Sequence, residues 1–243
     1  MYRARPMAET SKFHKLAFLQ ENSKGNLDAM KRLYRNPFGL VSRGQNADAL
    51  FDMLVMAFGD ITKHTTTTSL AWIHAQLECY LTDPQNRGTQ NKLWLKQRIQ
   101  GAFRSAIHQN RLDLVLFLWN LALSGAFLSG PEADQEAADL LTQHDYRCFT
   151  DACASGNLDI VEFLYDTSFI HKCVIPTGRM ETCWRSACIE GRLSIAKWLY
   201  NKSASQGFLL EVPQNYSPLV EEWVEGKRIE QEWILVEETG EFH

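Results

Sequence analysis

The stretch Trp184-Arg-Ser-Ala-Cys-Ile-Glu-Gly191-Arg-Leu-Ser-Ile-Ala-Lys-Trp-Leu-Tyr200 decides the fold of this chain of 243 residues. It recurs, with every apolar position matched and no gap, as Phe149-Thr-Asp-Ala-Cys-Ala-Ser-Gly156-Asn-Leu-Asp-Ile-Val-Glu-Phe-Leu-Tyr165. A third copy runs from Phe103 to Trp119, and a more divergent fourth copy ends in the stretch from Gly25 to Tyr34. This repetition indicates several copies of one structural unit.

Each copy predicts two short helices joined by a tight turn. The aromatic residue and the small residue three positions later lie on one helix face, so a neighbouring helix can approach closely. The residue that follows the first helix suits a left-handed position, where a helix ends at little steric cost. In the four copies these residues are Gly25, Asn110, Gly156 and Gly191. Such short helix pairs bury their apolar faces only when copies stack, which favours an all-α helical solenoid.

The copies resemble ankyrin repeats. Ala152-Cys153-x-x-Gly156 and Ala187-Cys188-x-x-Gly191 match the Ala-Ala-x-x-Gly of that family, and Leu158 and Leu193 fall on its next Leu. The segment 11–17 is similar to the Thr-Pro-Leu-His start, although no copy carries that start intact, which leaves the usual β-hairpins of the family open. The Leu-Tyr and Trp-Leu-Tyr endings look most like the divergent repeats of large DNA viruses and intracellular bacteria.

The family repeat length of about 33 residues sets the expected organisation. The interval from Leu27 to Leu112 has room for one more unit, with helices expected at 49–57 and 69–81. The interval from Leu112 to Leu158 has extra residues, expected as an inserted acidic helix at about 130–143. The sequence therefore predicts a flexible N-terminus over 1–10, a repeat domain of about five helix pairs over 11–203, and a C-terminal cap or acidic tail over 204–243.

Charge is uneven along the chain. Residues 1–35 carry eight Lys or Arg and three acidic residues, whereas residues 216–243 carry eight Glu and two basic residues. Both ends can be solvated termini or interaction segments. The segment 228–236 suggests a terminal strand or a cap. The alternative is a sorting signal, because the acidic end resembles the C-terminal stretches of bacterial effectors delivered by type IV secretion.

Composition excludes several classes of function. Hydrophobic residues make up 45% and charged residues 22% of the chain, as in ordinary folded proteins. No apolar run is long enough for a membrane span, and no apolar region follows the basic N-terminus as in a signal peptide. A pI near 6.0 argues against a duplex nucleic-acid binder. We expect a cytoplasmic protein, or one secreted into a host cell without a classical signal peptide.

Catalytic, metal and cofactor signatures are not expected. Cys148 and Cys153, like Cys183 and Cys188, are five residues apart on expected helices, so their thiols diverge and suit a core better than zinc. No phosphate-binding or nucleophile motif is present. The remaining enzymatic alternative is a cysteine-dependent reaction at Cys173, with His171 or His144 as the base.

Binding to another protein is the function that the pattern favours. Stacked helix pairs present a continuous surface lined by variable residues of the first helices. The candidate partner-binding residues are Arg104, Ser105, His108, Gln109, Thr150, Asp151, Ser155, Arg185, Ser186 and Glu190. The resemblance implies a non-enzymatic effector of an intracellular microbe that binds a host protein; a subunit of a larger assembly is a further alternative.

Aromatic residues divide into two groups by their place in the repeat. Phe103, Phe149 and Trp184 are periodic and are expected in the core. The tryptophans outside the register, if exposed, are candidate anchors for a partner; they are Trp72, Trp94, Trp223 and Trp233.

Overall fold

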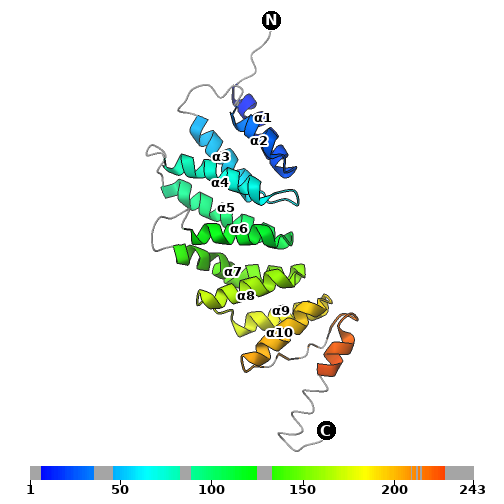
Figure 1. Cartoon of the computed structure of the whole chain (residues 1–243). Coiled ribbons are helices and arrows are strands. Elements are labelled where there is room, and N and C mark those ends of the chain that lie inside the picture. The colour runs from blue at the N-terminus through cyan, green and yellow to red at the C-terminus, as the bar shows by residue number, and fades with distance from the viewer. Residues whose placement is uncertain are drawn as a thin grey trace, which may run out of the picture. The chain divides into compact units, whose positions relative to one another are not determined.

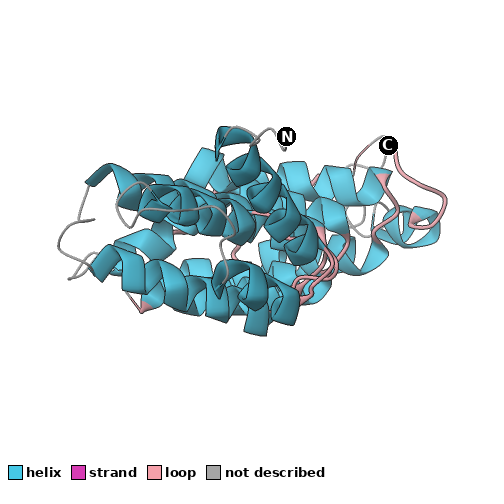
Figure 2. Cartoon of the chain, turned by 90° about the horizontal axis from the view of Figure 1, so that it is seen from above, coloured by secondary structure: helices cyan, strands magenta, loops and turns pink. Residues whose placement is uncertain are grey.

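The structure is a computed structural model that describes residues 7–35, 46–82, 89–124, 133–208, 210–211, 213 and 215–227 (Figure 1). All regular secondary structure within these residues is helical (Figure 2). The labelled helices are α1 (Met7–Ser23), α2 (Leu27–Arg35), α3 (Asn46–Gly59), α4 (Thr67–Thr82), α5 (Thr89–His108), α6 (Leu112–Leu123), α7 (Ala133–Ser155), α8 (Leu158–Ile170), α9 (Thr177–Ile189) and α10 (Leu193–Ser205). An all-α fold is thus confirmed for the described residues. We call α1, α3, α5, α7 and α9 the first helices, and the others the second helices.

The chain divides into two compact units, unit 1 (Met1–Leu140) and unit 2 (Leu141–His243). In unit 1 each first helix packs on the second helix that follows it, which gives the pairs α1–α2, α3–α4 and α5–α6. Successive first helices also pack on one another, α1 on α3 and α3 on α5, and these contacts are more extensive than those between α4 and α6. The two helices expected at 49–57 and 69–81 correspond to α3 and α4.

The core of unit 1 lies between and within these pairs. Phe103 is fully buried, as its place in the repeat predicted. Ala102 and Ala106 on α5 and Ala57 on α3 are also fully buried, and their small side chains allow the first helices to approach closely. Larger buried side chains fill the space between the helices; they include Phe18, Met30, Phe51, Phe58, Ile73 and Leu77.

The turns between paired helices in unit 1 stack on one another. Gly25 has φ +69°, and a Cβ atom there would lie 2.3 Å from the carbonyl oxygen of His64 in the next turn. The Thr62 hydroxyl donates to the carbonyl of Ser23 at 3.1 Å. On the other side, Arg111 Nη1 donates to the carbonyl of Lys63 at 3.2 Å. The turn after α3 is therefore held by the turns on both sides of it.

Unit 2 contains the end of α7, then α8, α9 and α10, with α9 and α8 both packed on α10. Phe149 and Trp184 are buried, as predicted, and so are the four cysteines of the repeat, Cys148, Cys153, Cys183 and Cys188. Gly156 and Gly191 adopt φ of +85° and +72°, and Asn110 in unit 1 adopts +55°. The left-handed positions predicted from the repeat are thus confirmed.

Helix α7 differs from the expected pattern. Residues 133–143 do not form an inserted helix of their own but continue into the first helix of the fourth pair, so that α7 runs from Ala133 to Ser155. The reason is local, because no Gly or Pro interrupts this stretch before Gly156. Tyr146, whose φ is +59°, lies at the junction.

The N-terminal boundary also differs, since α1 begins at Met7 and not near residue 11. Residues 7–10 therefore belong to a helix, which starts directly after Pro6, a residue favoured at helix N-termini. Residues 1–6, the expected strand or cap at 228–236 and Trp233 lie outside the described residues.

The described residues among 208–227, which we call the C-terminal segment, pack against the last helix pair. Leu210, Val220 and Val224 are almost fully buried, and residues 221–227 are helical. The indole Nε1 of Trp184 donates to the carbonyl of Glu211 at 2.9 Å, and the amide of Ser217 donates to the carbonyl of Cys188, also at 2.9 Å. The segment covers apolar surface of α9 and α10 that would otherwise face solvent.

Candidate functional site

In unit 1 the candidate partner-binding residues lie at the C-terminal end of α5 and in the turn after it. Arg104 and Ser105 are half-buried, whereas His108 is exposed. Two further residues of α5, Gln97 and Gly101, are also exposed and share this helical face, since 97, 101, 104, 105 and 108 follow the i, i+4, i+7, i+8, i+11 spacing. A Cβ atom at Gly101 would meet no atom within 4 Å. We call these five residues the α5 face.

Gln109 has a structural role that the sequence did not reveal. Its side-chain amide Nε2 donates a 2.6 Å hydrogen bond to the carbonyl of Ile61, in the turn between α3 and α4. The amide group therefore links two neighbouring turns. Its position in the repeat predicted that Gln109 binds a partner, but neighbouring turns meet at the same position.

The candidate residues on α7 in unit 2 are largely engaged within the protein. The Thr150 hydroxyl accepts from the thiol of Cys183 on α9, at 3.8 Å. Asp151 has only 14% of its side chain exposed and lies 3.9 Å from Nε of Arg147. The Ser155 hydroxyl donates to the carbonyl of Ala152 at 2.8 Å. These three side chains therefore present fewer unengaged polar groups to a partner than their sequence positions suggested.

The candidate residues on α9 form a more accessible polar strip. Arg185 is about half exposed and makes a 2.6 Å ion pair with Glu181, with a second carboxylate, that of Glu211, at 3.7 Å. The Ser186 hydroxyl donates to Oε1 of Glu190 at 3.2 Å, and Oε2 of Glu190 lies 3.9 Å from Nε of Arg192 in the turn that follows. Exposed pairs of this kind contribute little stability, so their charges are available for recognition.

Burial disfavours thiol chemistry at two of the core cysteines of unit 2. Burial raises the pKa of Cys188 to about 12, and burial also raises the pKa of Cys153, which is in contact with Cys183. Thiols with raised pKa values are poor nucleophiles at neutral pH. Cys173 is more accessible, but its sulfur contacts the backbone carbonyl of His171 at 3.3 Å.

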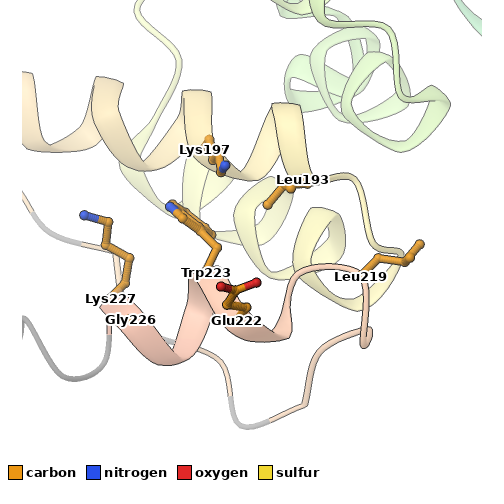
Figure 3. Close-up of a pocket in the computed structure, with 7 residues that line it drawn as sticks. All are labelled: Leu193, Lys197, Leu219, Glu222, Trp223, Gly226 and Lys227. Carbon is orange, nitrogen blue, oxygen red and sulfur yellow. The ribbon is translucent and has the colours of Figure 1, made fainter.

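A pocket of about 440 Å³ lies between α10 and the C-terminal segment (Figure 3). Its apolar wall consists of Leu193, Leu219 and Trp223, and its charged rim of Lys197, Glu222 and Lys227. Sequence reasoning missed this pocket, because it depends on how the C-terminal segment folds back. The spacing of Val220, Trp223 and Val224 was the one available signal that this segment has a buried helical face.

The three described tryptophans outside the repeat register are packed within the protein. Trp72 packs edge-on against Tyr34, with ring centroids 5.4 Å apart. Trp94 packs 5.9 Å from Phe51, and Trp223 is edge-on to Trp184 at 5.6 Å. All three are half-buried, so their rings serve mainly in packing.

Two features are absent from the described residues. Among them, no group of three or more His, Cys, Asp or Glu side chains is placed to hold a metal ion. None of the helices that the structure describes has the length and apolar character needed to span a bilayer.

Comparison with known proteins gave no relative: no family model, no curated protein and no solved structure matches this chain.

Proposed function

We propose that this protein is a non-enzymatic, ankyrin-like helical-repeat module that binds another protein through the exposed polar faces of its first helices. The observation that carries the proposal is the α5 face. It is a strip on one face of a first helix, where Gln97, Gly101 and His108 are exposed and Arg104 and Ser105 are half-buried. Gly101, which has no side chain, lies near the middle of the strip and has open space around it. At Gly101 a partner can reach the α5 backbone closely.

The packing of unit 1 supports this choice of surface. The first helices contact one another more extensively than the second helices do. When one layer of a stack is packed more closely than the other, the closer layer lies on the inner side of the bend. The α5 face therefore belongs to the inner side of unit 1, which is where repeat proteins present extended binding surfaces.

The surroundings of the α5 face favour a partner with acidic groups. Residues 84–112 include six Lys or Arg and no Asp or Glu. Lys96 is paired with Asp139 at 2.6 Å and Arg111 with Asp113 at 2.7 Å, so these two charges are partly neutralised. Charge of one sign on a rigid surface sets partner choice and association rate more than affinity.

The source implied by the ankyrin resemblance makes a host protein the proposed partner, with the protein acting as an effector of an intracellular microbe. Two alternatives remain, a cysteine-dependent enzyme and a subunit of a larger assembly.

The test is affinity capture from a eukaryotic cell lysate with four forms of the full chain. These are the wild type, Gly101→Ala, Gly101→Leu and the control Ala75→Leu, which places the same leucine side chain at an exposed position on the second helix α4. All four are expected to fold, because both sites are exposed helix positions and Gly101 has open space around it. Their circular dichroism and thermal unfolding verify this.

The proposal predicts one protein that is retained by the wild type, Gly101→Ala and Ala75→Leu, and is lost with Gly101→Leu. Its binding to Arg104→Glu should also weaken by at least tenfold, roughly 1.4 kcal/mol. If a captured protein is retained equally by Gly101→Leu and by Arg104→Glu, the α5 face is not the binding surface.

A further inference from the structure

The turn between α8 and α9 in unit 2 exposes three large apolar side chains within six residues. Phe169 and Ile170 are each 71% exposed and Val174 is 59% exposed. Soluble proteins rarely leave such side chains clustered in water, and a cluster of this kind marks a site of interaction with a protein or a membrane. We call Phe169, Ile170 and Val174 the apolar turn.

The backbone presents these side chains outward. Helix α8 ends at Ile170, and Lys172, with φ +56°, reverses the chain direction in a left-handed conformation. The amide of Cys173 donates back to the carbonyl of Ser168 at 2.8 Å and closes the turn. Ile175 is buried beneath it. The hydrogen bond and the burial of Ile175 therefore hold the backbone of the turn in place, while the three apolar side chains remain exposed.

Basic residues lie in and just after the apolar turn. Residues 167–180 include Lys172 and Arg179 and no Asp or Glu, although the whole chain is net negative. Asp166 is exposed one helical turn before Ile170, and the next acidic residue after the turn is Glu181. Lys172 is exposed. A basic stretch around exposed apolar side chains complements an anionic surface that also accepts apolar groups.

The neighbouring aromatic residues have the character of a membrane interface. Tyr165 lies one helical turn before Phe169 and packs edge-on against Trp198, with ring centroids 5.1 Å apart. The ammonium of Lys202 lies 5.1 Å from the Tyr165 ring and 5.5 Å from the Trp198 ring. Tyrosine, tryptophan and lysine are the side chains that favour the headgroup level of a bilayer, because each combines an apolar body with a polar tip.

We propose that the apolar turn docks unit 2 reversibly on an anionic lipid bilayer, with Phe169, Ile170 and Val174 entering the interface and Lys172 and Lys202 facing the anionic headgroups. This peripheral contact is separate from the α5 face and needs no membrane-spanning helix. With three apolar side chains and two cations, the contact is weak, as for a single-signal anchor.

The test is sedimentation of the full chain with vesicles of equimolar phosphatidylcholine and phosphatidylserine, and with vesicles of phosphatidylcholine alone. Wild-type protein should bind the anionic vesicles and dissociate at high salt. The double variant Phe169→Ser/Ile170→Ser should lower the partition coefficient at least tenfold, and Lys172→Glu should lower it about fivefold or more.

The control is Ile189→Ser/Leu219→Ser, which removes two apolar side chains elsewhere in unit 2 that are 58% and 74% exposed. This control should bind the vesicles like the wild type, and unchanged thermal unfolding should verify that every variant folds. The proposal is overturned if wild-type protein does not bind the anionic vesicles, or if the Phe169→Ser/Ile170→Ser variant binds them as well as the control does. Loss of a protein partner without loss of vesicle binding would instead assign the turn to protein docking.

Discussion

The side-chain amide of Gln109 donates a 2.6 Å hydrogen bond to the backbone carbonyl of Ile61, and so joins the turn after α5 to the turn after α3. Replacing Gln109 by Ala removes the donor and leaves that carbonyl without this partner. We expect the free energy of unfolding to fall by about 1 kcal/mol. Urea denaturation followed by circular dichroism measures this change.

The exposed Gln97 on the α5 face provides the control for that measurement, because its replacement by Ala is the same chemical change. Gln97→Ala should leave the unfolding free energy within about 0.5 kcal/mol of the wild type. If Gln109→Ala is as neutral as Gln97→Ala, the hydrogen bond to Ile61 does not stabilise the turn.

Two glycines with similar backbone angles should respond differently to substitution. Gly25 has φ +69° and faces the carbonyl of His64 at 2.3 Å from an added Cβ, whereas Gly207 has φ +81° and open space around it. Gly207→Ala should cost only the left-handed strain, roughly 1–2 kcal/mol. Gly25→Ala should cost more than twice as much, because the stacked turns must also separate.

Thermal unfolding of the two glycine variants against the wild type makes the comparison directly. Equal losses would show that the contact between Gly25 and His64 relaxes without cost. Asn110→Gly serves as a third point, since its φ of +55° is already left-handed and Gly relieves that strain.

Stability should decrease on acidification through His74 on α4. Burial lowers the pKa of His74 below its ordinary value of 6.5, against a smaller opposing effect of Glu78. The folded state therefore disfavours the protonated imidazole, so stability is fully present above the unfolded pKa and declines as the pH falls below about 6.5. His74→Gln should unfold with a smaller loss of Tm between pH 7.5 and pH 5.5.

The measurement for His74 is the difference between wild type and His74→Gln in how Tm depends on pH, because the other groups titrate equally in both proteins. Parallel profiles for wild type and His74→Gln would show that burial of this imidazole does not contribute to the pH dependence.

The six thiols should separate into two classes of reactivity. Cys79 is exposed and Cys173 is half-buried, whereas the four cysteines of the repeat are buried. At pH 8 a thiol reagent should modify Cys79 first and Cys173 more slowly, and should reach the other four only after unfolding. Mass spectrometry of the labelled peptides identifies each site. A rapid, pH-sensitive reaction at Cys173 would support the alternative that the protein is a cysteine-dependent enzyme.

Much of the fold was predictable because the repeat has strong local signals. The left-handed residues Asn110, Gly156 and Gly191 follow from turn chemistry, and the buried Phe103 and Trp184 follow from periodicity. The span of α7 was not predictable from the repeat alone, since residues ahead of Cys148 have helix-forming composition but no matching copy elsewhere.

The candidate site was less predictable than the fold. Sequence position identifies which side chains lie on a first helix, but not which of them are already engaged. Thr150 is engaged by Cys183, and Asp151 is mostly covered, because neighbouring helices meet there. The apolar turn and the pocket beside Trp223 arise from segments outside the matched copies, where no repeat constrains the residues.

The contact between the C-terminal segment and the last helix pair has a consequence for where helix pairs can be added to the chain or removed from it. Trp223 and Val224 occupy surface of α9 and α10 on which a further helix pair of a repeat array would stack. Duplication of a repeat in the gene would be tolerated upstream of this segment but not beyond it. A fusion partner joined directly after residue 205 would replace the C-terminal segment. Trp184 and Tyr200 would then be exposed, and their exposure would favour self-association.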